Sequence, residues 1–192
     1  MLAGWEVSGV RAAGPLTLTD CTPLAKVLLR APFGGQAAAE IAVPLGRARR
    51  DGDGVLVVGS GPGEWLAIGP PGHADAIAAR LEELAGRHPA EPASVVDLTH
   101  GRALIRLTGP RAADVLAVLC GIDLSEPVTP DGAAFRSSIA ALATDVIRDD
   151  VAGTRSYLLH CERSSGQYLF DALLTAGHDL DIEIDGFVAP GI

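Results

Sequence analysis

The sequence predicts an α+β protein in which antiparallel strands form sheets that carry helices on one face. Three observations support this prediction. Residues 95–119 have the pattern of strand, turn, strand and helix, residues 73–85 have the spacing of an amphipathic helix, and much the same order of strands and helix occurs twice in the 192 residues. We therefore expect duplicated strand-helix units, the first in residues 1–92 and the second in residues 93–192.

The first elements are separated by glycine and proline. Glycines and Pro15 punctuate residues 1–20, which indicates an arm that crosses the surface, with Trp5 as its anchor. Residues 24–32 are expected to form a strand that ends at a proline, and residues 37–43 a short helix.

A hairpin and a helix are expected next. Two apolar runs, residues 55–59 and 64–69, flank the turn sequence SGPG, which is typical of a β-hairpin. From His73, apolar residues repeat at three and four positions while charged residues occupy the other face, which predicts an amphipathic helix. Residues 88–92 contain two prolines and are the expected linker between the halves.

The second half begins with the pattern that is clearest in the chain. Residues 95–98 and 103–107 are expected strands on either side of the His100-Gly101 turn, and Pro110 fits the first turn of a helix that reaches residue 119. A loop at residues 123–132 follows. Three more strands are expected at residues 134–142, 145–148 and 155–161. A helix is expected at residues 166–176, with Gly177 as its end, and a charged edge strand at residues 181–185.

The two halves can be aligned with each other. Placing Trp65 on Tyr157 aligns residues 64–84 with residues 156–176 without a gap, and it places Ile77 on Leu169 and Leu81 on Leu173. The same order of elements in both halves indicates duplication, although shared secondary structure alone would produce a similarity this faint.

Composition and charge exclude several classes of protein. The net charge of −9 opposes binding to a phosphate backbone, so no nucleic-acid partner is expected. Arg47, Arg49 and Arg50 form the only basic patch, and the DGDG that follows indicates a solvated loop. The mean hydropathy is +0.28, but charged residues interrupt every run long enough to span a membrane. With no signal-peptide pattern at the start, the expected compartment is the cytoplasm.

Metal and disulfide sites are not expected from the cysteines. Cys21, Cys120 and Cys161 are odd in number, far apart and without CxxC spacing, which fits a reducing compartment. The sequence Gly59-Ser-Gly-Pro-Gly63 superficially suggests a phosphate-binding loop, but a strand rather than a helix follows it, so a hairpin turn is favoured.

No active site can be assembled from the sequence. Asp97 could orient His100 as a general base, but no nucleophile accompanies the pair, and a turn histidine is the simpler interpretation. His160 alternates with apolar neighbours and is expected to pack half-buried in a strand, while His73 and His178 occupy ordinary surface positions. Asp149 and Asp150 are expected in a solvated loop. We therefore assign no catalytic, cofactor-binding or metal-ligating residue.

Several stretches together resemble the gamma subunit of heterotetrameric sarcosine oxidase. They are VVDLTHGRALIRLTGPRAADVLAVLCGIDL, AFRSSIAALATDVIR and SYLLHCERSSGQYLFDALL, with LAKVLLR and GPGEWLAIGP nearer the start. The most specific piece is the strand-GP-helix unit leading to Arg163, Ser164, Tyr168 and Leu169. The resemblance covers nearly the whole chain and implies the fold of the aminomethyltransferase folate-binding domain, to which this family is related.

The resemblance implies partners rather than a reaction in this chain. It implies a complex that demethylates sarcosine to glycine with production of hydrogen peroxide and transfers the one-carbon unit to tetrahydrofolate. Larger alpha and beta subunits would hold FAD, FMN and NAD, and a small delta subunit would bind zinc. This chain would be a non-catalytic accessory subunit without a cofactor of its own, and the arm and residues 187–192 are its expected contact surfaces.

One departure from the folate-binding relatives bears on this chain. Those proteins usually carry a Gly-Gly loop and an Asp-Asp pair where this sequence reads Ala140-Ala-Leu-Ala-Thr-Asp145, so Asp145 is only the nearest counterpart of the acidic residue that contacts folate. The main alternative is a stand-alone folate-binding protein of the aminomethyltransferase-like superfamily, and a further alternative is a scaffold of the same fold without ligand.

Overall fold

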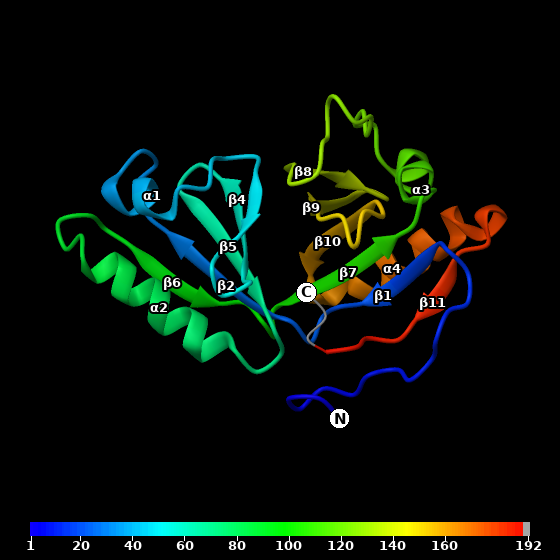
Figure 1. The fold of residues 1–192 in the computed structure, drawn as a ribbon, viewed down its shortest axis with the longest axis horizontal. Helices are drawn as coiled ribbons and strands as arrows, with labels where there is room; N and C mark the ends of the chain where they lie inside the picture. The colour runs from blue at the N-terminus through cyan, green and yellow to red at the C-terminus, as the bar shows by residue number, and fades with distance from the viewer. Residues whose placement is uncertain (190–192) are drawn as a thin grey trace.

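Two β-sheets pack face to face, and helices cover their outer faces (Figure 1). The structure is a computed structural model that describes residues 1–189. One apolar cluster lies between the two sheets. A second lies between the six-stranded sheet and its helices, and a third between the five-stranded sheet and its helices. The last three residues of the expected contact tail, residues 190–192, lie outside the described residues.

Six strands form the sheet on the right of Figure 1. Its spatial order is β11 (Glu183–Asp185), β1 (Thr17–Asp20), β7 (Arg102–Thr108), β10 (Ser156–Glu162), β9 (Leu142–Arg148) and β8 (Ala134–Ile139). The β1–β11 pair is parallel, and the other neighbours are antiparallel.

Five antiparallel strands form the other sheet. Its order is β3 (Ala48–Arg50), β4 (Leu56–Gly61), β5 (Glu64–Gly69), β2 (Ala25–Arg30) and β6 (Ser94–Asp97). Each sheet includes one strand from the other half of the chain, because β1 joins the six-stranded sheet and β6 joins the five-stranded one. This exchange of β1 and β6 joins the two halves of the chain. The division into halves at residue 92 stays a prediction.

Alternation along the strands produces the three layers of apolar contacts. In β7, Ala103, Ile105 and Leu107 pack under the helices, whereas Leu104 faces the other sheet. In β10, Leu158 likewise faces the other sheet. Polar side chains that share this inner face therefore lie in the layer between the two sheets, which determines where the candidate site can form.

Amphipathic helices close the outer faces. Helix α2 (Ala74–Gly86) buries Ile77 and Leu81 on the five-stranded sheet. Helices α3 (Ala112–Leu119) and α4 (Gly166–Ala176) lie on the six-stranded sheet, where α4 buries Leu169 and Leu173. Helix α1 (Gln36–Ile41) is short, and two one-turn 3-10 helices occupy Arg163–Ser165 and His178–Leu180. None of the helices within residues 1–189 is long and apolar enough to cross a membrane.

Most predicted elements are present with small differences in their ends. The hairpin β4–β5, helices α1 to α4 and the strand-turn-strand-helix unit are confirmed. The strands of that unit enter different sheets, β6 in one and β7 in the other. Strand β9 starts at Leu142 rather than at Asp145, because two alanines with positive φ, Ala140 and Ala141, form a tight turn after β8.

Two predictions of unstructured surface are wrong. Residues 17–20 form β1 rather than part of the arm, and Leu16 and Leu18 are fully buried, because β1 fills the position between β7 and β11. Residues 48–50 form β3 rather than a solvated loop. Both strands are three or four residues long, so neither has enough alternation to be recognised from sequence.

The arm itself is ordered against its own chain. Val10 accepts a backbone hydrogen bond from Gly186, and the carboxylate of Glu183 accepts from the amides of Ala13 and Gly14. Trp5 stacks on His100 with ring centroids 4.9 Å apart, and the guanidinium of Arg163 lies 4.8 Å from the Trp5 ring centre. The predicted role of Trp5 as an anchor is confirmed.

Candidate functional site

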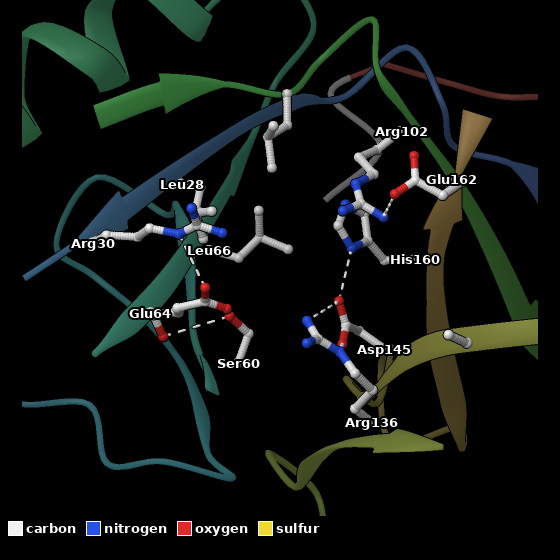
Figure 2. A pocket seen from close by; sticks show the side chains of 12 residues that line it. Leu28, Arg30, Ser60, Glu64, Leu66, Arg102, Arg136, Asp145, His160 and Glu162 are labelled. Atoms are coloured by element: carbon white, nitrogen blue, oxygen red, sulfur yellow. Dashed lines mark hydrogen bonds and ion pairs between the residues drawn. The ribbon is translucent and has the colours of Figure 1, made fainter. Parts of the chain in front are cut away.

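A polar pocket of about 260 Å³ lies between the two sheets (Figure 2). Strands β2, β4 and β5 form one wall, and β7 to β10 contribute most of the other. Its lining includes six charged side chains and one histidine: Arg30, Glu64, Arg102, Arg136, Asp145, Glu162 and His160. Leu28, Leu66 and Leu98 supply part of its apolar lining.

All six charges of the pocket are neutralised in three ion pairs. Arg30 pairs with Glu64 at 3.0 Å, Arg102 with Glu162 at 2.7 Å, and Arg136 with Asp145 at 2.6 Å. In each pair the two residues are direct partners in the strand register, across β2–β5, β7–β10 and β8–β9 respectively. Because directly opposed residues on one face lie within reach of each other, the register itself pairs these charges.

Asp145 also holds the one histidine of the pocket. His160 Nδ1 lies 3.1 Å from Asp145 Oδ2, and the two residues are again register partners, on β10 and β9. Burial lowers the pKa of His160 and outweighs the hydrogen bond to Asp145, which would raise that pKa, so the ring is neutral near pH 7. Burial would raise the pKa of Asp145, but the hydrogen bonds with His160 and Arg136 outweigh it and hold that pKa below its usual value.

This arrangement determines the tautomer of His160. An ionised Asp145 accepts a hydrogen bond from Nδ1–H, so Nε2 of the neutral ring carries no proton and is left as an acceptor. Nε2 is buried and has no hydrogen-bond partner within residues 1–189. A hydrogen-bond donor placed at Nε2 would satisfy the one polar atom of His160 that lacks a partner among the described residues.

Lys26 is a second buried basic group between the sheets. Its side chain is fully buried, and Nζ donates to the carbonyl oxygens of Thr22 at 2.8 Å and Leu24 at 2.6 Å. Burial, followed by the nearby charge of Arg163, lowers the pKa of Lys26 to about 8. Lys26 does not line the pocket, so its ammonium group supports the chain locally.

A second charged network connects the two sheets. Asp149 accepts hydrogen bonds from Arg50 of β3 at 2.8 Å and from Arg106 of β7 at 2.7 Å, and it is buried. Arg148 pairs with Asp150 at 2.9 Å. The prediction of a solvated loop at Asp149 and Asp150 is therefore wrong, because both carboxylates neutralise arginines in or beside the inter-sheet layer.

The remaining residues considered from the sequence do not form a second site. Asp97 accepts from the amide of Thr99 rather than orienting His100, whose ring stacks on Trp5. Gly59-Ser-Gly-Pro-Gly63 forms the end of β4 and the turn that leads into β5, so the predicted hairpin is confirmed. His160 is more deeply buried than predicted and is hydrogen-bonded rather than simply packed.

Two of the three cysteines are poor nucleophiles near neutral pH. Burial raises the pKa of Cys21 to about 12 and that of Cys161 to about 11, so both thiols stay protonated near neutral pH. Within residues 1–189, no three His, Cys, Asp or Glu side chains are grouped as a metal site would require. The lining of the pocket supplies hydrogen-bonding groups that can recognise a polar group.

Comparison with known proteins identifies the fold family. The model of the family described as GCVT N-terminal domain matches residues 51–190, well over half of the chain. The chain belongs to the GCVT N-terminal domain family. The predicted relation to the aminomethyltransferase fold is thereby confirmed.

Relatives of this GCVT domain include two kinds of protein. The aminomethyltransferase of Saccharopolyspora erythraea is 28% identical over 187 residues, which cover 90% of this chain and 49% of that protein. The sarcosine oxidase subunit gamma of Arthrobacter sp. is 34% identical over 120 residues, 58% of this chain and 57% of that protein. The chain thus spans about half the length of these relatives. The predicted similarity to gamma subunits is confirmed.

A solved structure has the same fold over nearly the same length. A chain of the heterotetrameric sarcosine oxidase from Corynebacterium sp. U-96, determined with pyrrole 2-carboxylate, superposes with a TM-score of 0.74 at 24% identity. The match covers 88% of this chain and 88% of that one. The two-sheet arrangement is therefore a property of this GCVT fold rather than of one sequence.

Proposed function

We propose that the chain is a non-catalytic accessory subunit of a heterotetrameric sarcosine oxidase complex. The observation that carries this proposal is the pairing of every charge in the pocket between the sheets. Arg30, Arg102 and Arg136 each face a carboxylate in register, so each charge already has a partner within its own sheet and the lining of the pocket carries no net charge. Similarity to a gamma subunit at 34% identity supports the same assignment.

The reaction would take place elsewhere in the complex. Sarcosine would be demethylated oxidatively to glycine with production of hydrogen peroxide, and the one-carbon unit would pass to tetrahydrofolate as co-substrate. The larger alpha and beta subunits would hold FAD, FMN and NAD, and the small delta subunit would hold zinc. In this chain, the Asp149 network, which joins Arg50 of β3 to Arg106 of β7, would keep the two sheets in a fixed arrangement that partner subunits recognise.

The compartment proposed for the complex is the cytoplasm. All three cysteines are free thiols and all are buried, which fits a compartment that keeps thiols reduced. The experiment that tests the assignment is purification of the tagged chain from its native host followed by mass spectrometry, which should recover two larger chains and a small one.

A stand-alone folate-binding protein is the second candidate. The observation in its favour is that Asp145 lies in the pocket, bonded to Nδ1 of His160, while the buried Nε2 of the same ring has no hydrogen-bond partner within residues 1–189. Two features oppose it. The pocket, at about 260 Å³, falls below the usual range for sites that enclose a whole ligand of this size, about 300 to 1,000 Å³. Asp145 is also already paired with Arg136, so the residues present do not fit a whole folate.

A further inference from the structure

A different cavity lies on the outer face of the five-stranded sheet, beside α2. Its volume is about 500 Å³, within the usual range for small-molecule sites. The apolar part of its lining comes from strands β4 and β5 and from both helices of this half: Ile41, Val57, Trp65, Ala67, Leu81 and Leu84. It is separated from the pocket of Figure 2 by the sheet itself, because Val57 and Ala67 face α2.

Strand register determines the floor of this cavity. Arg49 pairs with Val57, Val57 with Ala67, and Ala67 with Val27, so the four residues form one row across β3, β4, β5 and β2. Val27 and Ala67 are buried under α2, and Val57 is only partly buried. The row therefore runs from the apolar core outward to a guanidinium at the edge of the sheet.

Within residues 1–189, Arg49 is the cation of this cavity that no carboxylate neutralises. Arg80 pairs with Asp51 and Asp53, each at 2.6 Å. Arg87 pairs with Glu40 and Glu83, and Arg50 pairs with Asp149. Arg49 is exposed and forms no ion pair in the part of the chain that the structure describes. A bound anion would thus meet one free guanidinium.

We propose that this cavity binds a small amphipathic carboxylate. Its apolar chain would lie over Val57 and Ala67 beside Leu84, and its carboxylate would accept two hydrogen bonds from Arg49. One guanidinium matches one planar carboxylate in a bidentate pair. A dianion such as a phosphate monoester is disfavoured, because one unpaired guanidinium balances only one of its two charges, and the other arginines that line the cavity already have carboxylate partners.

Isothermal titration of the full chain with octanoate tests the proposal. Octanoate should bind with one site per chain, and Arg49→Gln should weaken binding at least about tenfold, the usual loss for one charge-assisted pair. Arg47→Gln is the matched control, because Arg47 is an exposed arginine two residues away that does not line the cavity, and it should leave the affinity unchanged. 1-Octanol, which has the same chain without the charge, should bind at least about tenfold more weakly than octanoate.

Several results would overturn the proposal. One is the absence of octanoate binding to the unmodified chain, and another is equal affinity in Arg49→Gln. Octanol binding as tightly as octanoate would show a site without a carboxylate contact. Sedimentation velocity provides the remaining test, since a dimer dissociated by Val57→Ser would show that a second copy covers this face. None of these results bears on assembly with partner subunits, so the proposal stands or fails independently of the proposed function.

Discussion

Asp145 Oδ2 lies 3.1 Å from His160 Nδ1, and the two residues face each other directly across β9 and β10. The same carboxylate is paired with Arg136 on its other side, in register across β8 and β9. Asp145 therefore joins three neighbouring strands of the six-stranded sheet within the layer between the sheets. Its carboxylate is used by the fold, which is why it is a poor candidate for contact with a ligand.

Asp145→Ala should destabilise the chain by about 1 to 3 kcal/mol, because it leaves the buried Nδ1 of His160 without an acceptor. Urea unfolding measures this change. Glu162→Ala is the matched control, since Glu162 is 64% exposed and forms an ion pair that should contribute no more than about 1 kcal/mol. Equal losses in the two variants would show that Asp145 has no special place in the sheet.

Lys26 should make stability depend on pH in the alkaline range. Its pKa is about 8 in the folded chain and 10.5 for the ordinary group, so between these values the unfolded chain binds more protons and stability rises with pH. From pH 7.5 to 10.5, the free energy of unfolding should rise by about 3 kcal/mol more in the unmodified chain than in Lys26→Met. Parallel pH profiles for the two proteins would contradict the lowered pKa.

Trp5→Ala should destabilise the chain by about 1 to 2 kcal/mol, because Trp5 stacks on His100 and contacts the Arg163 guanidinium. Phe33→Ala is a suitable control, since Phe33 is 67% exposed and its loss should change stability by no more than about 0.5 kcal/mol. Thermal unfolding of both variants shows whether Trp5→Ala loses more stability than Phe33→Ala. A Trp5→Ala protein as stable as the control would show that the arm is frayed in solution.

The sequence predicts the helices better than the site. Helix α2 is recognisable because Ile77 and Leu81 repeat at helical spacing opposite charged residues. The ion pairs of the pocket are not recognisable, because Arg30 and Glu64 are 34 positions apart and become neighbours only through the β2–β5 register. Pairing of this kind depends on which strands lie side by side, and no local pattern carries that information. The same reason hides the contact of Asp149 with Arg50 and Arg106.

Reduced folate should bind the isolated chain only weakly, with a dissociation constant well above micromolar. A pterin ring that donates a hydrogen bond to Asp145 would have to displace Arg136. Without that contact, a buried N–H of the pterin would stay unpaired, at a cost of about 1 to 3 kcal/mol. Titration calorimetry measures the affinity, and Asp145→Ala identifies the contact. Micromolar binding that this substitution abolishes would support the stand-alone folate-binding protein instead.

Recovery of partner subunits tests the central claim most directly. The tagged chain, purified from its native host at moderate salt, should carry two larger chains with flavin absorbance and a small zinc-binding chain, all identified by mass spectrometry. The chain separated from them should show no flavin bands. A chain that purifies alone from cells grown on sarcosine, with the partner subunits present in the same lysate but not bound, would contradict its assignment as an accessory subunit.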